Sequence, residues 1–260
     1  MHLGLVFFHG WGLSPAFWQP LATRLPQYPQ VFADVGYFGP TQSPTVTPHL
    51  PPGHRWVGIG HSLGFARALQ SPPAQGWAAL VSVAGFARFC PPVENPIAAS
   101  PPNAVAVAVA TTPGPASTGA ATATSAGGAP ALAAQPRRVV ERMLRAHARD
   151  PHAVLADFLH RCGLADLLPP PGTPLNVERL AADLALLLDV DVSAPLAALD
   201  VPVLALATRD DPIVPAALIE ATFAQRAHTQ LVWQAQGGHA LGYAGVDDCA
   251  VAVQTFLERV

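Results

Sequence analysis

Charged residues and cysteines are both scarce in this chain of 260 residues. Only 12% of the residues are charged and the formal net charge is −3, which argues against a general nucleic-acid binder and against binding to a strongly charged membrane surface. The three cysteines, Cys90, Cys162 and Cys249, show no CxxC spacing, so the sequence predicts neither a disulfide framework nor a zinc site. This cysteine usage fits a reducing compartment.

The start of the chain lacks a long apolar run. Residues 3–8 are apolar but too few for a membrane span or for the core of a signal peptide, and no basic segment precedes them. We therefore expect a buried strand here, in a cytoplasmic protein that does not enter a membrane.

Apolar residues are nevertheless abundant, since 50% of the chain is hydrophobic, and at this length they can form a large core. Short apolar runs alternate with stretches of helical periodicity. The runs cover residues 3–8, 31–35, 56–59, 78–84, 201–207 and 231–233, and the periodic stretches cover 14–25, 137–149, 153–162, 177–188 and 246–260. This alternation predicts an α/β fold, with a mostly parallel central sheet flanked by helices.

One segment has a different composition. From about residue 91 to residue 136 the chain is dominated by alanine, proline, threonine, serine and glycine, with almost no charge. Such a segment lacks the large apolar side chains that offset the entropy of ordering, so we expect a mobile insertion without chemistry. It lies within residues 90–195, which we expect to form a helical cap inserted into a core made of residues 1–89 and 196–260.

Ser62 is the candidate nucleophile because it stands in the motif Gly60-His61-Ser62-Leu63-Gly64, between a predicted strand and a helix-compatible segment. A serine at such a sharp turn sits in strained backbone, and the flanking glycines let strand and helix approach closely. The Leu63 N–H, at the start of the helix, can then face a developing oxyanion. Taken alone, the stretch is equally compatible with a glycine-rich turn that contains an incidental serine.

Three other segments supply the groups that such a serine needs. His9-Gly10-Trp11-Gly12 follows the first strand, where glycines permit a tight turn with exposed N–H groups, although a packed tryptophan in a turn is the alternative. Asp210 or Asp211 follows the strand at 201–207, and His239 follows the last strand. Acidic helix caps and a loop histidine are the ordinary alternatives for these residues.

The order serine, aspartate, histidine matches an α/β-hydrolase triad, and the carboxyl ends of parallel strands would bring all three side chains to one edge of the sheet. Neutral imidazole can take the serine proton during attack and return it to the leaving alcohol, while the carboxylate holds the ring. This chemistry needs no metal ion and no organic cofactor.

Residues 3–89 and 137–260 resemble the α/β-hydrolase family through the motifs above together with Asp211-Pro212-Ile213-Val214-Pro215 and Gly238-His239. A narrower resemblance, to the pimeloyl-[acyl-carrier protein] methyl ester carboxylesterases of biotin synthesis, rests on Trp11, Leu63 and the segment Asp157-Phe158-Leu159. The resemblance implies a triad of Ser62, Asp211 and His239, because the Asp-x-x-Val-Pro pattern selects Asp211 over Asp210. It also implies oxyanion donors at the N–H groups of Trp11 and Leu63.

The same resemblance implies substrate contacts from Trp11, His61 and Phe158, with Phe158 in an acyl pocket. His61 stands where the biotin-synthesis esterases have a tryptophan, so we expect an altered pocket wall. A row of arginines at helical spacing resembles a surface that receives an acyl-carrier protein, with an ordinary solvated helix face as the alternative: Arg138, Arg142, Arg145 and Arg149. The chain also lacks the hairpin that usually precedes the His-Gly strand, so we expect one shorter sheet edge.

The sequence therefore predicts a serine-dependent carboxylic ester hydrolase that works through an acyl-enzyme on a short or medium acyl ester. The specific expectation is the pimeloyl-carrier methyl ester of biotin synthesis. One alternative is a hydrolase of small esters or lactones with an unrelated substrate, and the other is a catalytically silent binding protein with a hydrolase fold.

Overall fold

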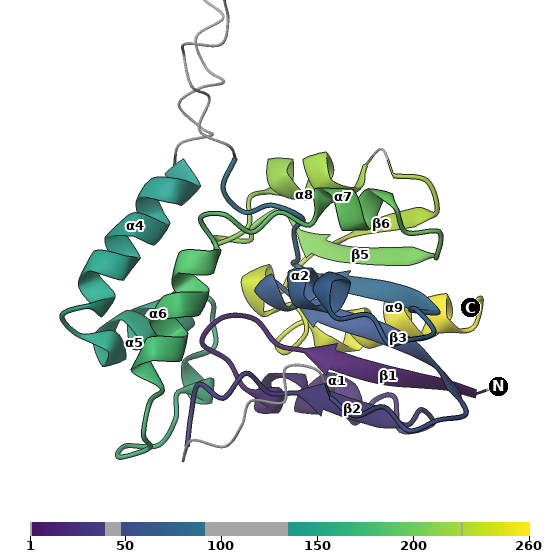
Figure 1. Ribbon diagram of the computed structural model, residues 1–260, viewed down its shortest axis with the longest axis horizontal. Helices are drawn as coiled ribbons and strands as arrows, with labels where there is room; N and C mark the ends of the chain where they lie inside the picture. The colour runs from purple at the N-terminus through teal and green to yellow at the C-terminus, as the bar shows by residue number, and fades with distance from the viewer. Residues whose placement is uncertain (1, 40–47, 92–134, 225) are drawn as a thin grey trace, which may run out of the picture.

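The computed structural model of the chain describes residues 2–39, 48–91, 135–224 and 226–260. Within them, the predicted α/β architecture is confirmed: six parallel strands form one sheet in the order β2-β1-β3-β4-β5-β6, and helices flank it (Figure 1). The strands are β1 (His2–Phe8), β2 (Gln30–Ala33), β3 (His54–His61), β4 (Ala79–Val83), β5 (Val203–Thr208) and β6 (Thr229–Gln234). Neighbouring strands pair in parallel throughout the sheet.

The central strands explain the continuous apolar runs in the sequence. Every residue of β4 and of β5 is buried, as expected for parallel strands that are covered on both faces. The edge strands β2 and β6 are only partly buried, which fits their more polar composition. Each fully buried large apolar side chain in this core contributes about 1.5–3 kcal/mol to folding.

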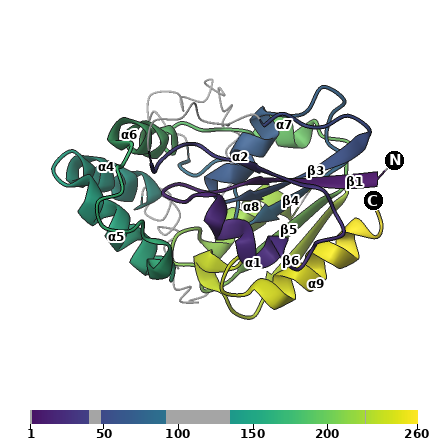
Figure 2. The same ribbon diagram turned by 90° about the horizontal axis from the view of Figure 1, so that it is seen from below.

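Helices cover both faces of the sheet. Figure 2 shows α1 (Gln19–Ala22) and α9 (Val246–Leu257) along one face, and α2 (Leu63–Gln70) with α7 (Ser193–Ala197) along the other. A further helix, α8 (Ala216–Phe223), contacts α2 through the rings of Phe65 and Phe223, whose centroids are 5.6 Å apart.

The helices α4 (Gln135–His147), α5 (Pro151–Arg161) and α6 (Val177–Leu186) gather beyond the carboxyl ends of the strands (Figure 1). Backbone hydrogen bonds tie the segment before α6 to the loop after β2, from Asn176 N–H to Tyr37 O (2.9 Å) and from Gly39 N–H to Pro174 O (3.0 Å). The division into a core and a cap of residues 90–195 stays a prediction. The predicted insertion at 91–136 lies outside the described residues, apart from 91, 135 and 136.

The segment 14–25 is not the single helix that its periodicity predicts. Ser14 does cap it, since its hydroxyl accepts the Ala16 N–H at 3.3 Å, but a short 3-10 helix, Pro15–Trp18, comes before the four residues of α1. Pro20 explains the break, because proline has no N–H to donate and its ring crowds the preceding turn. The short helices α7 and α8 were not predicted.

All three cysteines are buried and free. Burial raises the pKa of Cys90 to about 11 and that of Cys249 to about 12, so these thiols stay neutral near pH 7. Across the described ranges, the structure has no helix that is both long and apolar enough to cross a bilayer.

Candidate active site

Ser62 occupies the turn between β3 and α2, with φ 53° and ψ −124°. A positive φ is uncommon for a residue with a side chain and costs of order ~1–3 kcal/mol. The surrounding structure holds this conformation, because the Ser62 N–H donates to Val83 O (3.0 Å) and its carbonyl accepts the Phe65 N–H (3.1 Å). The strained turn that the motif predicts is therefore present.

The two glycines of the motif are required by close backbone contacts. A Cβ atom at Gly64 would overlap the carbonyl group of Phe8 in the neighbouring strand. One at Gly60 would overlap the backbone of Phe65 in the first turn of α2. Because the overlaps involve backbone atoms rather than flexible side chains, only glycine lets strand and helix meet this tightly.

His239 and Asp211 form a buried pair on two loops that follow β6 and β5. The His239 Nδ1–H donates to Asp211 Oδ2 at 2.9 Å, and the two side chains are only 1% and 3% exposed. The other carboxylate oxygen, Oδ1, accepts the N–H groups of Ile213 (2.7 Å) and Val214 (2.9 Å). Three hydrogen bonds thus fix the carboxylate, and the carboxylate in turn fixes the imidazole ring.

This pairing leaves Nε2 of His239 as the atom that can accept a proton. When the ring is neutral and Nδ1 carries the hydrogen, Nε2 has a free lone pair. The atom is buried and has no hydrogen-bond partner among the described residues. No hydrogen bond joins it to the Ser62 hydroxyl in the described chain, and catalytic contacts of this kind commonly tighten only when substrate binds.

His61 connects the turn at Ser62 to the loop that contains His239. Its Nε2–H donates to the backbone oxygen of His239 at 2.9 Å, and the two imidazole rings lie 4.7 Å apart. The His61 ring also packs on Phe17, with ring centroids 4.3 Å apart. Burial, helped by the neighbouring His239, holds the pKa of His61 well below its usual value, so the ring stays neutral.

The expected contact between His61 and the substrate stays a prediction. The described residues that line the cavity beside Ser62 do not include His61, whose ring is almost completely buried behind His239. The His61 side chain packs on Phe17 and Trp18 and hydrogen-bonds to the backbone of His239.

The oxyanion role of the Trp11 and Leu63 N–H groups stays a prediction. Leu63 is the first residue of α2, and Trp11 is the third residue after the end of β1. In the described part of the chain neither backbone N–H donates to a protein acceptor, so both are available to a ligand. The Trp11 side chain is fixed as well, because its Nε1–H donates to Leu180 O in α6 at 2.8 Å and its ring meets the edge of Phe158.

A cavity of about 560 Å³ opens beside Ser62. Its walls are mainly apolar and come from the loop after β1, from the segment between β4 and Pro91, from α4 to α6, from the loop after β5 and from α8. They include Trp11, Phe86, Phe89, Val139, Val140, Met143, Phe158, Leu184, Leu187, Ile213 and Leu218. Trp11 and Phe158, two of the predicted substrate contacts, are therefore in the cavity wall.

Among the described lining residues only Arg161 is charged, and it pairs with Asp157 at 2.8 Å. Such a volume and lining are typical of a site for an apolar small molecule. Most of these residues could not be identified from the sequence, where they resemble ordinary core positions. Only their convergence on Ser62 distinguishes them.

The predicted arginine row lies on and just after α4. Arg138, Arg142, Arg145 and Arg149 are all exposed. Their exposure fits an ordinary solvated helix face as well as a docking surface, so the carrier-docking role stays a prediction.

An ion pair that the sequence did not reveal lies between α2 and α6. Arg67 Nη2 is 2.7 Å from Asp183 Oδ2, and both side chains are only 8% exposed. The guanidinium also donates to Tyr37 OH at 3.4 Å, and burial raises the pKa of that phenol above its ordinary value. The pair connects α2, which follows Ser62, to α6, whose Leu180 carbonyl accepts the Trp11 indole N–H.

No group of three or more histidine, cysteine, aspartate or glutamate side chains in the described ranges is arranged to hold a metal ion.

Comparison with known proteins adds to this geometry. No family model matches the sequence, and no curated protein sequence matches it. Solved structures do match nearly the whole chain. An esterase from Exiguobacterium antarcticum is 13% identical with a TM-score of 0.69, over 99% of this chain and 92% of that one.

Two other matching structures have different activities in their names. A bromoperoxidase from Bacillus anthracis is 14% identical with a TM-score of 0.71, and an enol-lactonase from Burkholderia xenovorans LB400 is 13% identical with a TM-score of 0.64. Each match covers 99% of this chain and 92% of the other. The chain has the α/β-hydrolase fold. At such low identity the likeness establishes this fold alone, so the activity must be argued from the site.

Within the α/β-hydrolase fold, the residues described above occupy the carboxyl edge of a parallel sheet, where open α/β sheets bind their ligands. Ser62 follows β3, Asp211 follows β5 and His239 follows β6. The fold brings the three predicted triad residues to one edge of the sheet, with the apolar cavity next to Ser62.

Proposed function

We propose that this protein is a serine-dependent carboxylic ester hydrolase that works through an acyl-enzyme. The observation that carries the proposal is the buried hydrogen bond between His239 Nδ1 and Asp211 Oδ2, which leaves Nε2 as the proton acceptor beside the strained turn of Ser62. A serine hydroxyl is a weak nucleophile by itself and needs a base oriented in this way.

In the first step the Ser62 oxygen attacks the ester carbonyl carbon while His239 Nε2 takes the hydroxyl proton. The carbonyl oxygen becomes an oxyanion, which the N–H groups of Trp11 and Leu63 stabilise by about 3 kcal/mol each. The imidazolium is stabilised by the Asp211 carboxylate. Collapse of the intermediate breaks the bond to the alcohol oxygen, which receives the proton from Nε2.

In the second step water replaces the alcohol. His239 takes a proton from the water molecule, whose oxygen attacks the acyl carbon and forms a second oxyanion at the same two N–H groups. Collapse releases the carboxylic acid and returns the proton to the Ser62 oxygen. Both steps use the same base and the same donors, so one rigid site serves the full cycle.

The cavity wall favours an ester with an apolar acyl group. Its aromatic and aliphatic side chains can bury such a group, and burial is favourable by about 0.8 kcal/mol for each methylene. A pimeloyl-carrier methyl ester is the finer proposal within this class, supported by the resemblance at Trp11, Leu63 and Phe158 and by the exposed arginine row. A lactone is the cyclic member of the same chemical class.

The serine assignment is tested by Ser62→Ala, measured on a panel of p-nitrophenyl esters, a lactone, and dicarboxylic methyl esters both free and carrier-linked. We expect kcat to fall by roughly 10⁴-fold or more, because the nucleophile is removed. The far-ultraviolet circular dichroism should not change. Turnover close to that of the parent protein would contradict the proposal.

A fluorophosphonate probe separates the hydrolase from a catalytically silent binding protein of the same fold. The probe reacts only with an activated serine, so we expect it to label the parent protein at Ser62 and to leave Ser62→Ala unlabelled. A parent protein that is folded but unlabelled would favour the binding protein.

A further inference from the structure

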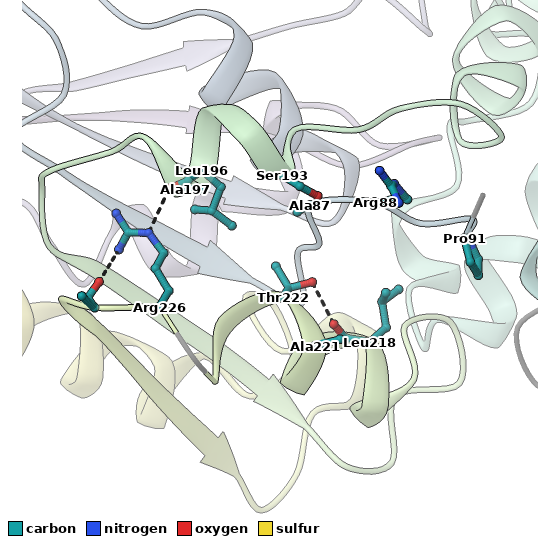
Figure 3. A pocket seen from close by; sticks show the side chains of 11 residues that line it. Ala87, Arg88, Pro91, Ser193, Leu196, Ala197, Leu218, Ala221, Thr222 and Arg226 are labelled. Atoms are coloured by element: carbon teal, nitrogen blue, oxygen red, sulfur yellow. Dashed lines mark hydrogen bonds between the residues drawn. The ribbon is translucent and has the colours of Figure 1, made fainter. Parts of the chain in front are cut away.

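A second cavity, of about 540 Å³, lies between α7 and α8 (Figure 3). We call it the α7–α8 groove. Its walls come from the segment after β4, from α7, from α8 and from the loop before β6. The lining residues are Ala87, Arg88, Pro91, Ser193, Leu196, Ala197, Leu218, Ala221, Thr222, Arg226 and Ala227.

The groove and the active-site cavity share part of their walls. Pro91, Leu218 and Ala221 line both of them. Leu218 and Ala221 are three residues apart on α8, so they project from the same side of the helix. In Figure 3 Pro91 lies at the end of the groove away from Arg226, while Leu218 and Ala221 lie on α8 between the two. The groove is therefore adjacent to the cavity beside Ser62, and the two are bounded in part by the same residues.

The main polar side chains of the groove are already occupied by other protein groups. Arg226 donates from all three of its nitrogens, to the carbonyls of residues 196, 199, 201 and 227 and to Thr229 Oγ1. The Thr222 hydroxyl donates to Leu218 O at 2.8 Å, and Arg88 pairs with Asp191. A guanidinium that is fully engaged in this way cannot bind an anionic ligand without losing those bonds.

What the groove offers a ligand is therefore apolar surface. Its remaining lining is mostly alanine, leucine and proline, and the small alanines leave room for a narrow chain. Each of the two cavities alone lies within the usual volume of a complete small-molecule site, roughly 300–1,000 Å³. A compact substrate needs only one of them, whereas a long flexible chain can occupy both.

We propose that the α7–α8 groove binds the distal end of a long, uncharged acyl chain whose ester carbonyl lies at Ser62. This inference rests on the proposed hydrolase function and specifies its substrate class. The chain passes Leu218 and Ala221 and continues along α7. Chain-length preference is then set by residues that are far from the triad in the sequence.

Ala197→Trp tests the groove, because Ala197 is exposed on α7 and lines the groove but not the active-site cavity. The matched control is Ala198→Trp, which adds the same side chain at the neighbouring exposed position, outside the groove lining. The assay is kcat/KM for saturated p-nitrophenyl esters of four to sixteen carbons. In the parent and in the control, kcat/KM should rise about threefold to fourfold for each methylene that enters the groove.

For Ala197→Trp we expect this rise to stop, so that the ratio of kcat/KM for the longest to the shortest ester falls at least tenfold. Equal ratios in Ala197→Trp and Ala198→Trp would contradict acyl-chain binding in the groove but would leave the proposed hydrolase function unaffected.

Binding of n-alkanols of four to twelve carbons, measured by calorimetry, tests chain binding in the groove independently of ester hydrolysis. If the parent protein hydrolyses no ester, the proposed function fails. Binding of an alkyl chain in the groove is still supported if alkanol affinity increases with chain length and Ala197→Trp abolishes that increase. It is contradicted if the affinities of the parent protein and the variant are the same.

Discussion

Replacing Asp211 with asparagine would change a single atom of the side chain that holds His239. In the parent protein, Oδ1 accepts the N–H groups of Ile213 and Val214, and Oδ2 accepts the His239 Nδ1–H. An amide NH₂ group cannot take the Oδ1 position, because it would face two other donors. The asparagine must therefore keep its oxygen there and turn its NH₂ group toward His239.

This orientation reverses the role of the imidazole. Nδ1 of His239 now faces a donor, so it must accept, and in the neutral ring the proton moves to Nε2. The nitrogen that should take the Ser62 proton is then already protonated. We expect kcat to fall by about 10⁴-fold, the cost of holding a triad histidine in the wrong tautomer. The free energy of unfolding should change by no more than about 1 kcal/mol, because the backbone hydrogen bonds remain.

The assay is steady-state turnover of the best ester in the panel, with urea unfolding as the measure of stability. Asp210→Asn is the matched control, since Asp210 is the exposed neighbour. It should keep the parent activity within about twofold, as surface substitutions usually do. An Asp211→Asn variant with more than a tenth of the parent kcat, or an equal loss in Asp210→Asn, would refute this account of the triad.

Two further predictions concern stability. Because burial lowers the pKa of His61, the unfolded chain binds a proton below pH ~6.5 that the folded chain does not, so the free energy of unfolding decreases as the pH falls below that value. His61→Phe should lose less stability than the parent between pH 8 and pH 5.5 in urea unfolding, and an equal loss would contradict the assignment. Arg67→Met or Asp183→Leu alone should cost about 3–5 kcal/mol, because each leaves a buried charge without its partner, whereas the double variant should recover most of the loss. Additive losses in this double-mutant cycle would show that the two charges do not interact.

The sequence determined the class of fold because parallel strands covered on both faces must be continuously apolar. Residues 78–84 and 201–207 carry that pattern, and β4 and β5 are buried along their full length. The pattern was less informative near residue 20, where helical periodicity masked the break that Pro20 makes. The apolar pattern also did not predict α7 and α8, because these helices are too short to show a clear helical periodicity.

The same reasoning applies to the candidate site. Local sequence fixed the turn at Ser62, since a serine between two glycines at the end of an apolar run predicts the strained conformation that the structure contains. Sequence also indicated Asp210 or Asp211, together with His239, as candidate partners of Ser62, and the family resemblance selected Asp211. That Nδ1 of His239 meets Oδ2 of Asp211, and that Nε2 is the atom left free, depends on two loops that lie 28 residues apart in the chain.

Tertiary structure alone decided which side chains surround these residues. His61 is beside Ser62 in the sequence, yet its ring contacts Phe17 and His239, which come from segments far away along the chain. The cavity wall combines side chains from the loop after β1, from the segment after β4, from α4 to α6 and from α8, and most of them look in the sequence like ordinary core residues. A local pattern can specify a turn or a strand, but the shape of a pocket depends on contacts between segments that only the folded chain brings together.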